Sequence, residues 1–142
     1  MGNSLSELTS YFQPLAEQLI ASANDAGLDV VIEDTGRTEV QQQLKLATGV
    51  SWTQRSKHLP QPPEMKSEAI DLVPAVCMSL KYWGWGGTIQ NSNAAWGKLI
   101  AIARGIPGIK CGVDFPHPDV GHFQYQRIYA SGDILVPQRD LT

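Results

Sequence analysis

The sequence predicts a single α+β domain over residues 1–142, with a small, mostly antiparallel sheet flanked by helices. A length of 142 residues is typical of one compact domain. Apolar residues follow helical spacing near the N-terminus and again in the middle of the chain. Short β-rich runs gather around the histidines, and this order of elements is typical of helices packed on a small sheet.

The first helix has clear start and stop signals. Apolar residues at helical spacing run over 8–23, behind a possible capping box formed by Ser4 and Glu7. Pro14 should kink this helix or split it into two pieces, and Gly27 should end it. Similar signals predict helices over 38–49 and from Asn91 or Ser92 to 105, strands over 28–32, 69–73, 109–113, 122–125 and 127–130, and loops over 59–67 and 82–87.

Composition and charge exclude several classes of protein. Apolar residues make up 42% of the chain, which is too many for a disordered protein. The 11 basic and 14 acidic residues give a net charge of −3, so we expect no nucleic-acid partner held by phosphate contacts. No apolar run approaches the ~20 residues that span a bilayer, and we expect neither membrane insertion nor a signal peptide.

The two cysteines, Cys77 and Cys111, lack the CxxC spacing of a metal knuckle. They can pair or stay as buried free thiols, and the lack of an export signal favours free thiols.

Three histidines are available for chemistry: His58, His117 and His122. The chain contains no HExxH motif of a helix-borne zinc protease, and no GxSxG or SxxK motif that would present a serine nucleophile. A metal site would therefore have to draw its ligands from separate segments.

Two segments carry a recognisable pattern. Ser56-Lys57-His58 is followed, after a proline-rich loop, by Ser67-Glu68-Ala69-Ile70-Asp71, and Asp119 precedes His122 by three residues. Together they resemble the zinc D,D-/L,D-peptidase family, which carries Ser-x-His-x-x-Gly-x-Ala-x-Asp and then an acid three residues before a second histidine. The similarity is greatest to its phage endolysin branch, the L-alanyl-D-glutamate endopeptidases.

The resemblance extends over residues 14–126. Gly36-Arg37-Thr38, with Gln41 or Gln42 and Gly49, is similar to the family's Gly-x-Arg-Thr…Gln…Gly stretch, and residues 111–115 are similar to its Trp-Gly-Gly-Asp-Trp run. Two departures stand out: Ser67 replaces a glycine, and the loop between His58 and Asp71 is six residues longer than the family pattern. A longer turn costs little if the two strands that it joins still pair.

The resemblance implies that these residues form a zinc site. Hydrolytic zinc sites have three protein ligands and one open position, and His58, Asp71 and His122 supply two imidazoles and one carboxylate. Asp119 lies close enough in sequence to His122 to act as the proton acceptor and donor. Arg37 is expected to stabilise the oxyanion or hold a substrate carboxylate.

Supporting roles are expected for three more residues. Ser56, two positions before His58 and on the same side of an expected strand, should orient a ligand or bind substrate. Gln41 is expected beside the substrate, and Asp114 is expected to support the loop that holds Asp119.

Each of these residues also has a purely structural interpretation. Taken alone, Asp71 would be a strand-end carboxylate, Asp119 a turn former, and Arg37 a surface partner of a neighbouring glutamate. His117 is an alternative ligand with different spacing, but it lies between two prolines with no acid three residues before it. Trp96 falls on a helical apolar stripe and should be core, whereas Trp83 and Trp85 can be core or line a groove.

The resemblance implies a hedgehog/D,D-peptidase-like fold and a zinc peptidase that cuts the L-alanyl-D-glutamate bond of the peptidoglycan stem peptide. An endolysin of this kind would act as a monomer and stay in the host cytoplasm until a holin opens the membrane. The alternatives are a D-alanyl-D-alanine carboxypeptidase, a non-catalytic zinc-stabilised binding module, and a muramidase that uses two carboxylates.

Overall fold

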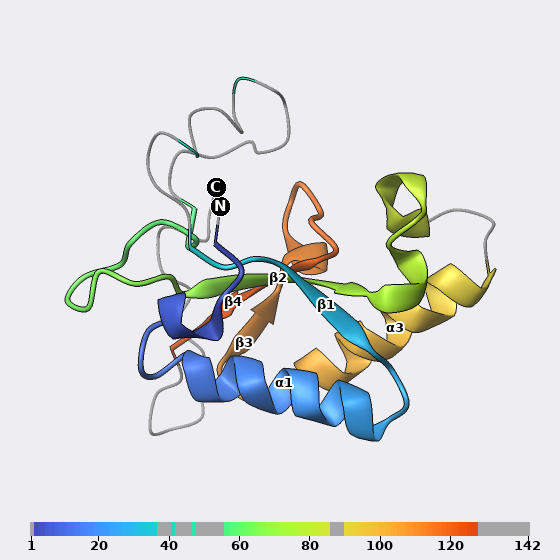
Figure 1. Cartoon of the computed structure of the whole chain (residues 1–142), viewed down its shortest axis with the longest axis horizontal. Helices are drawn as coiled ribbons and strands as arrows, with labels where there is room; N and C mark the ends of the chain where they lie inside the picture. Colours follow the sequence, from blue (N-terminus) through green and yellow to red (C-terminus); the bar gives the residue numbers. More distant parts are fainter. Residues whose placement is uncertain (1, 37–40, 42–46, 48–55, 86–89, 128–142) are drawn as a thin grey trace.

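Two helices and four strands make up the described part of the chain, which comprises residues 2–36, 41, 47, 56–85 and 90–127 of a computed structural model (Figure 1). No helix among these residues is long and apolar enough to cross a membrane. The α+β class is confirmed. The elements are α1 (Gln13–Asp25), β1 (Val30–Asp34), β2 (Ala69–Pro74), α3 (Gln90–Arg104), β3 (Ile109–Cys111) and β4 (His122–Tyr125), with 3-10 turns at Leu5–Glu7, Ala75–Cys77, Lys81–Gly84 and Gly112–Asp114.

The four strands form one sheet in the order β1-β2-β4-β3, and every neighbouring pair is antiparallel. Strands β2 and β4 are therefore neighbours in the middle of the sheet, although 47 residues separate the end of β2 from the start of β4. Their register sets Ile70 opposite Phe123 and Asp71 opposite His122. This register brings the second and third residues of the expected zinc site together.

Side-chain alternation separates the core from the site. Successive strand residues point to opposite faces of a sheet, so Ile70, Leu72 and Phe123 face one way while Asp71 and His122 face the other. The first three are fully buried and belong to the core cluster formed with α1 and α3. Both helices pack on this face of the sheet (Figure 1). The opposite face carries Asp71 and His122.

The N-terminal segment follows the sequence prediction closely. Ser4 and Glu7 form the expected capping box, but it caps the 3-10 turn Leu5–Glu7 rather than a long helix. Pro14 then falls in the first turn of α1, where a missing backbone N–H costs nothing, so the helix is split as expected. Gly27, at a φ of 82°, follows the end of α1 in the left-handed conformation that favours glycine.

Three boundaries differ from the prediction. Asn91 and Ser92 lie inside the first turn of α3 rather than capping it, and the Ser92 hydroxyl instead donates to the carbonyl of Trp83 at 2.7 Å. Strand β3 ends at Cys111, because a 3-10 turn follows where the expected strand continued to residue 113. The strand expected over 28–32 occupies 30–34.

Other expectations have mixed outcomes. Cys77 and Cys111 are buried free thiols, as the sequence favoured. Trp96 is a fully buried core residue, whereas Trp83 is half-buried and Trp85 exposed. The helix expected over 38–49 lies outside the described residues apart from positions 41 and 47, and the strand expected over 127–130 lies outside them apart from residue 127.

Candidate metal centre

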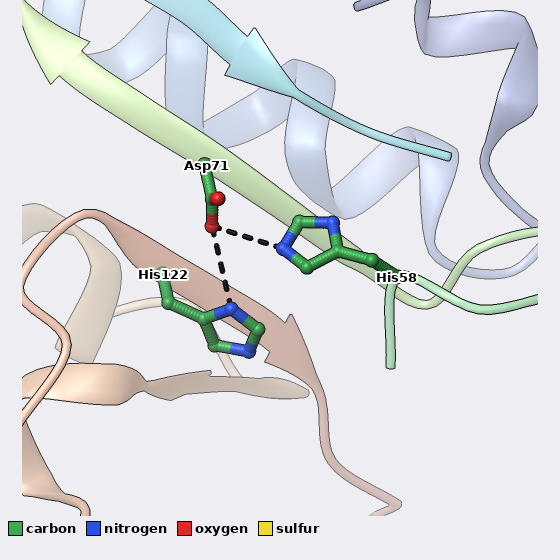
Figure 2. Close-up of side chains that lie close together, drawn as sticks. All are labelled: His58, Asp71 and His122. Carbon is green, nitrogen blue, oxygen red and sulfur yellow. Dashed lines mark hydrogen bonds and ion pairs between the residues drawn. The ribbon is translucent and has the colours of Figure 1, made fainter. Parts of the chain in front are cut away.

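Three side chains from three segments converge on the polar face of the sheet (Figure 2). Asp71 lies within β2, His122 begins β4, and His58 comes from a turn before the long loop. Asp71 Oδ1 lies 3.0 Å from His58 Nε2 and 3.3 Å from His122 Nδ1. One ligand atom from each residue lies within 4.8 Å of the other two, a spacing at which all three can share one metal ion.

The hydrogen bonds behind the two imidazoles fix which nitrogens face Asp71. His58 Nδ1 donates to the backbone carbonyl of Thr35 at 2.7 Å, and His122 Nε2 donates to Gln124 Oε1 at 2.7 Å. Both acceptors are oxygens without a hydrogen, so in a neutral imidazole the opposite nitrogen carries a lone pair. Two lone pairs and a carboxylate oxygen then point at one another, which is favourable only with a proton or a metal ion between them.

Electrostatics at the cluster favour positive charge. Burial alone would raise the pKa of Asp71, but the charges and hydrogen bonds of His58 and His122 lower it well below its usual range. Burial alone would lower the pKa of His122, but its hydrogen bond with Asp71 and the carboxylate charge raise it to about 8. Asp71 is thus held as an anion, and its field also attracts a cation to the two imidazole nitrogens.

A set of polar contacts holds the turn that carries His58. The Ser56 hydroxyl accepts a hydrogen bond from the backbone N–H of His58 at 3.1 Å. The expected strand at Ser56 is wrong, because this segment enters a turn. The Ser67 hydroxyl donates to the Thr35 carbonyl at 2.8 Å. Thr35 O therefore supports His58 and is itself tied to the start of β2.

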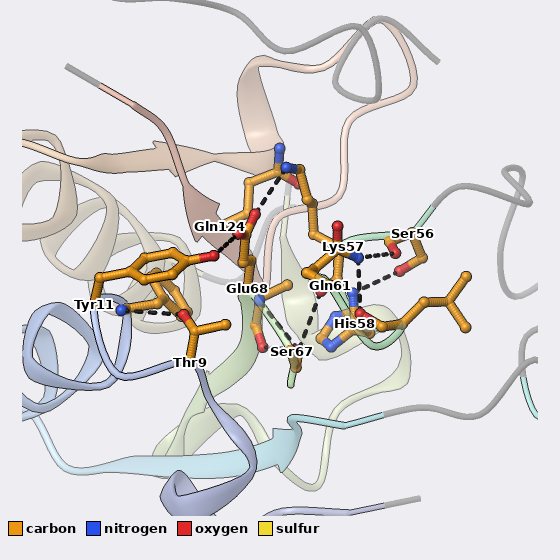
Figure 3. Close-up of polar contacts among 12 residues, drawn as sticks. Thr9, Tyr11, Ser56, Lys57, His58, Gln61, Ser67, Glu68 and Gln124 are labelled. Atoms are coloured by element: carbon orange, nitrogen blue, oxygen red, sulfur yellow. Dashed lines mark hydrogen bonds and ion pairs between the residues drawn. The ribbon is translucent and has the colours of Figure 1, made fainter. Parts of the chain in front are cut away.

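A buried ion pair joins the same turn to the sheet (Figure 3). Lys57 Nζ lies 2.9 Å from Glu68 Oε1, and both side chains are about nine-tenths buried. The Tyr11 hydroxyl donates to the other Glu68 oxygen, and Glu68 N–H donates to the Lys57 carbonyl at 2.9 Å. Burial, with the hydrogen bond to Glu68, raises the pKa of Tyr11 well above its usual range. These contacts fix the residue before His58 against the start of β2.

Asp119 lies at the exposed edge of the cluster. Its Oδ2 is 4.0 Å from His122 Nδ1, and half of its side chain is exposed. Backbone bonds place it there: Asp119 N–H donates to Gly112 O at 2.9 Å, and His122 N–H donates to Asp119 O at 3.1 Å. A Cβ at Gly112 would lie 2.4 Å from Asp119 O and 2.7 Å from the His122 Cβ, so only glycine permits this approach.

The other residues that the sequence suggests for the site lie in different parts of the molecule. Gln41 is half-buried and lines a cavity that His58 also lines. Asp114 pairs with Arg104 of α3 at 2.6 Å on the surface, and it thereby fastens the 3-10 turn before the Asp119 loop. His117 is exposed and is not among the clustered ligands of the described residues. Arg37 lies outside the described residues.

The sequence does not predict several residues that support the two histidines of the cluster. Gln124 lies two residues after His122 in β4 and so shares its face, which strand alternation could have revealed. The Lys57–Glu68 pair gives a weaker signal, since opposite charges beside two expected ligands are common on surfaces. The contribution of Thr35 is a backbone carbonyl, and no side-chain pattern reports it.

Comparison with solved structures finds a similar fold in the crystal structure of the L-Ala D-Glu endopeptidase ChiX of Serratia marcescens. The two chains superpose with a TM-score of 0.58 at 16% identity, over 85% of this chain and 82% of that chain. No family model and no curated protein matches the sequence. The chain therefore has the fold of a known peptidase structure, with a buried His-Asp-His cluster that can bind a metal ion.

Proposed function

We propose that this chain is a zinc-dependent peptidase that cuts the L-alanyl-D-glutamate bond of peptidoglycan stem peptides. One observation carries the proposal: two imidazole nitrogens and one carboxylate oxygen converge within 4.8 Å, beside a second, half-exposed carboxylate. The fold, similar to that of an L-Ala D-Glu endopeptidase, supports the same reaction class.

The donor set fits zinc. Imidazole nitrogen and carboxylate oxygen are common zinc ligands, and three protein ligands are typical of hydrolytic rather than structural sites. When bound, zinc supplies a Lewis acid that polarises a carbonyl group and makes water more acidic. His58, Asp71 and His122 would hold the ion, and Thr35 O and Gln124 would keep both imidazoles in the binding tautomer.

Proton transfer falls to Asp119. Its carboxylate stands at the exposed side of the cluster, where an attacking water and a scissile amide can both reach it. In this role it takes a proton from the water and gives it to the leaving amine. Arg37 is proposed to stabilise the negative charge that develops on the carbonyl oxygen.

The biological setting proposed is lysis of a bacterial host by a phage enzyme, acting on the wall after a holin has opened the membrane. A D-alanyl-D-alanine carboxypeptidase would use the same ligands on a different bond. A zinc-stabilised binding module would not need a carboxylate beside the cluster, so the position of Asp119 favours an enzyme.

The test is digestion of purified peptidoglycan with zinc-loaded protein, with and without a chelator, followed by mass spectrometry of the products. The proposal predicts new N-terminal D-glutamate that disappears with the chelator and returns with added zinc. Released D-alanine would instead identify a carboxypeptidase, and chelator-resistant reducing sugar ends would identify a muramidase. Zinc binding without any cleavage would leave only the binding module.

A further inference from the structure

Hydrogen bonds hold the long loop at 59–67 in a defined shape next to His58. The backbone N–H of Gln61 donates to Lys66 O at 2.8 Å, and that of Met65 donates to Gln61 O at 2.7 Å, closing a tight hairpin. The Gln61 side chain is buried at its base and donates to Leu59 O at 2.8 Å (Figure 3). The loop thus has a defined shape on the side next to His58.

A second anchor fixes the outer end of the loop. Both carboxylate oxygens of Glu64 accept hydrogen bonds from Ser10, one from its backbone N–H at 2.8 Å and one from its hydroxyl at 2.7 Å. These hydrogen bonds lower the pKa of Glu64, which keeps it an anion bound to Ser10. The loop is therefore fastened to the N-terminal segment as well as to its own base.

A cavity of about 440 Å³ lies between the loop and the N-terminal segment. Of the three residues of the metal cluster, His58 lines this cavity. Gly2 and Glu7 line it from the N-terminal side, and Met65 and Lys66 from the loop. Its volume is within the ~300–1,000 Å³ that pockets for small ligands occupy.

The charges that line this cavity differ in their availability. The Glu7 carboxylate accepts hydrogen bonds from the Thr35 hydroxyl and from Ser4 N–H, and these bonds, with that of Gly36, lower its pKa. Lys66 is exposed, and its ammonium forms no ion pair with any residue that the structure describes. Glu7 therefore stays an anion held by neutral donors, and Lys66 is the cation that lines the cavity.

From this arrangement we infer that the cavity is a substrate subsite and that Lys66 binds the free carboxylate of the D-glutamyl residue. A glutamyl residue within a peptide has two carboxyl groups, and the chain uses only one of them. The other is an anion unless amidated, and it needs a cation near the cluster that holds the scissile bond. The inference rests on the proposed function, and it assigns the extra loop a role in substrate selection.

The inference is tested by equilibrium binding rather than turnover. The probes are L-alanyl-γ-D-glutamyl-L-lysine and its counterpart with the free glutamyl carboxylate amidated, titrated calorimetrically with a chelator present so that neither is cleaved. We expect the protein to bind the carboxylate form about tenfold more tightly than the amide. Lys66→Met should bind both peptides equally, and Lys66→Arg should keep most of the preference.

Lys98→Met is the matched control, since it removes the same charge from α3, where Lys98 donates to Ala26 O at the end of α1. It should leave the tenfold preference intact. Equal binding of both peptides by the unaltered protein, or an unchanged preference in Lys66→Met, would overturn the subsite.

The subsite and the peptidase activity can fail separately. Peptidoglycan cleavage combined with equal binding of the two peptides would remove the subsite and leave the proposed function standing. A Lys66-dependent preference in a protein that cuts no stem peptide would keep the subsite and remove the reaction. Absence of both peptide binding and cleavage would end both proposals.

Discussion

The cluster is held in two different ways on its two sides. Asp71 and His122 lie opposite each other on paired strands, so the register of β2 and β4 places them. His58 lies in a turn and is placed by polar contacts: the Thr35 carbonyl, the Ser56 hydroxyl and the buried Lys57–Glu68 pair. Sheet register resists single substitutions, whereas a polar support depends on each member being paired.

This difference predicts where the site is vulnerable. On the strand side, a substitution should affect the metal ion directly and the fold little. On the turn side, it should affect stability first and metal binding through the position of His58.

Asp71→Asn should have the largest effect on metal binding. Asp71 Oδ1 is the only anionic ligand atom in the cluster and touches both histidines, so its loss should weaken zinc binding by more than the roughly 10–100-fold typical of supporting residues. Competition with a chromogenic chelator measures the affinity. Asp114→Asn, which removes a surface carboxylate paired with Arg104, is the control and should leave it unchanged. Equal affinities for the two variants would contradict the assignment of Asp71.

Breaking the Lys57–Glu68 pair should have the largest effect on stability. Glu68→Gln leaves the Lys57 ammonium buried without its counter-charge, which should cost about 3–5 kcal/mol of unfolding free energy. Urea denaturation of the metal-free protein measures this. The double variant Lys57→Met with Glu68→Leu should lose less, because no buried charge is left unpaired. A double variant as unstable as the single one would argue against this pair as the support of the turn.

The same double variant, Lys57→Met with Glu68→Leu, should also weaken zinc binding. With the pair gone, the residue before His58 loses its charged link to the start of β2, and zinc affinity of the folded protein should fall about tenfold. Unchanged affinity would show that Thr35 and Ser56 alone position His58.

Gln124→Met tests the strand side at the side chain that supports His122. It removes the oxygen that accepts from His122 Nε2, so the imidazole can adopt the wrong tautomer and zinc affinity should fall about tenfold. Gln124→Glu retains an acceptor oxygen and should stay near the original value. A similar loss in both variants would indicate a packing effect instead.

Ser56→Ala should have the smallest effect. It removes one hydrogen bond to the His58 backbone N–H, worth about 1 kcal/mol of unfolding free energy. Thermal unfolding measures the change, and Ser79→Ala, at an exposed position, should shift the midpoint far less. Equal shifts of the unfolding midpoint in Ser56→Ala and Ser79→Ala would show that the Ser56 hydroxyl does not stabilise the turn.

The sequence predicted the strand side of the site better than the turn side. Alternating apolar residues around Asp71 and His122 report strands and faces, and both strands are where they were expected. The sequence does not predict the turn at Ser56, because its supports are a backbone carbonyl and long-range polar contacts without periodicity. The same lack of periodicity left the loop at 59–67 without a role, although Glu64 and Gln61 give it a fixed shape.

Zinc K-edge X-ray absorption on the loaded protein, compared with Asp71→Asn, tests whether His58, Asp71 and His122 together bind one zinc ion. We expect one tightly held zinc per chain, with two imidazole nitrogens at about 2.0–2.1 Å, oxygen donors and no sulfur, and loss of this signature in the variant. A sulfur ligand, a single imidazole, or an unchanged spectrum in Asp71→Asn would contradict it.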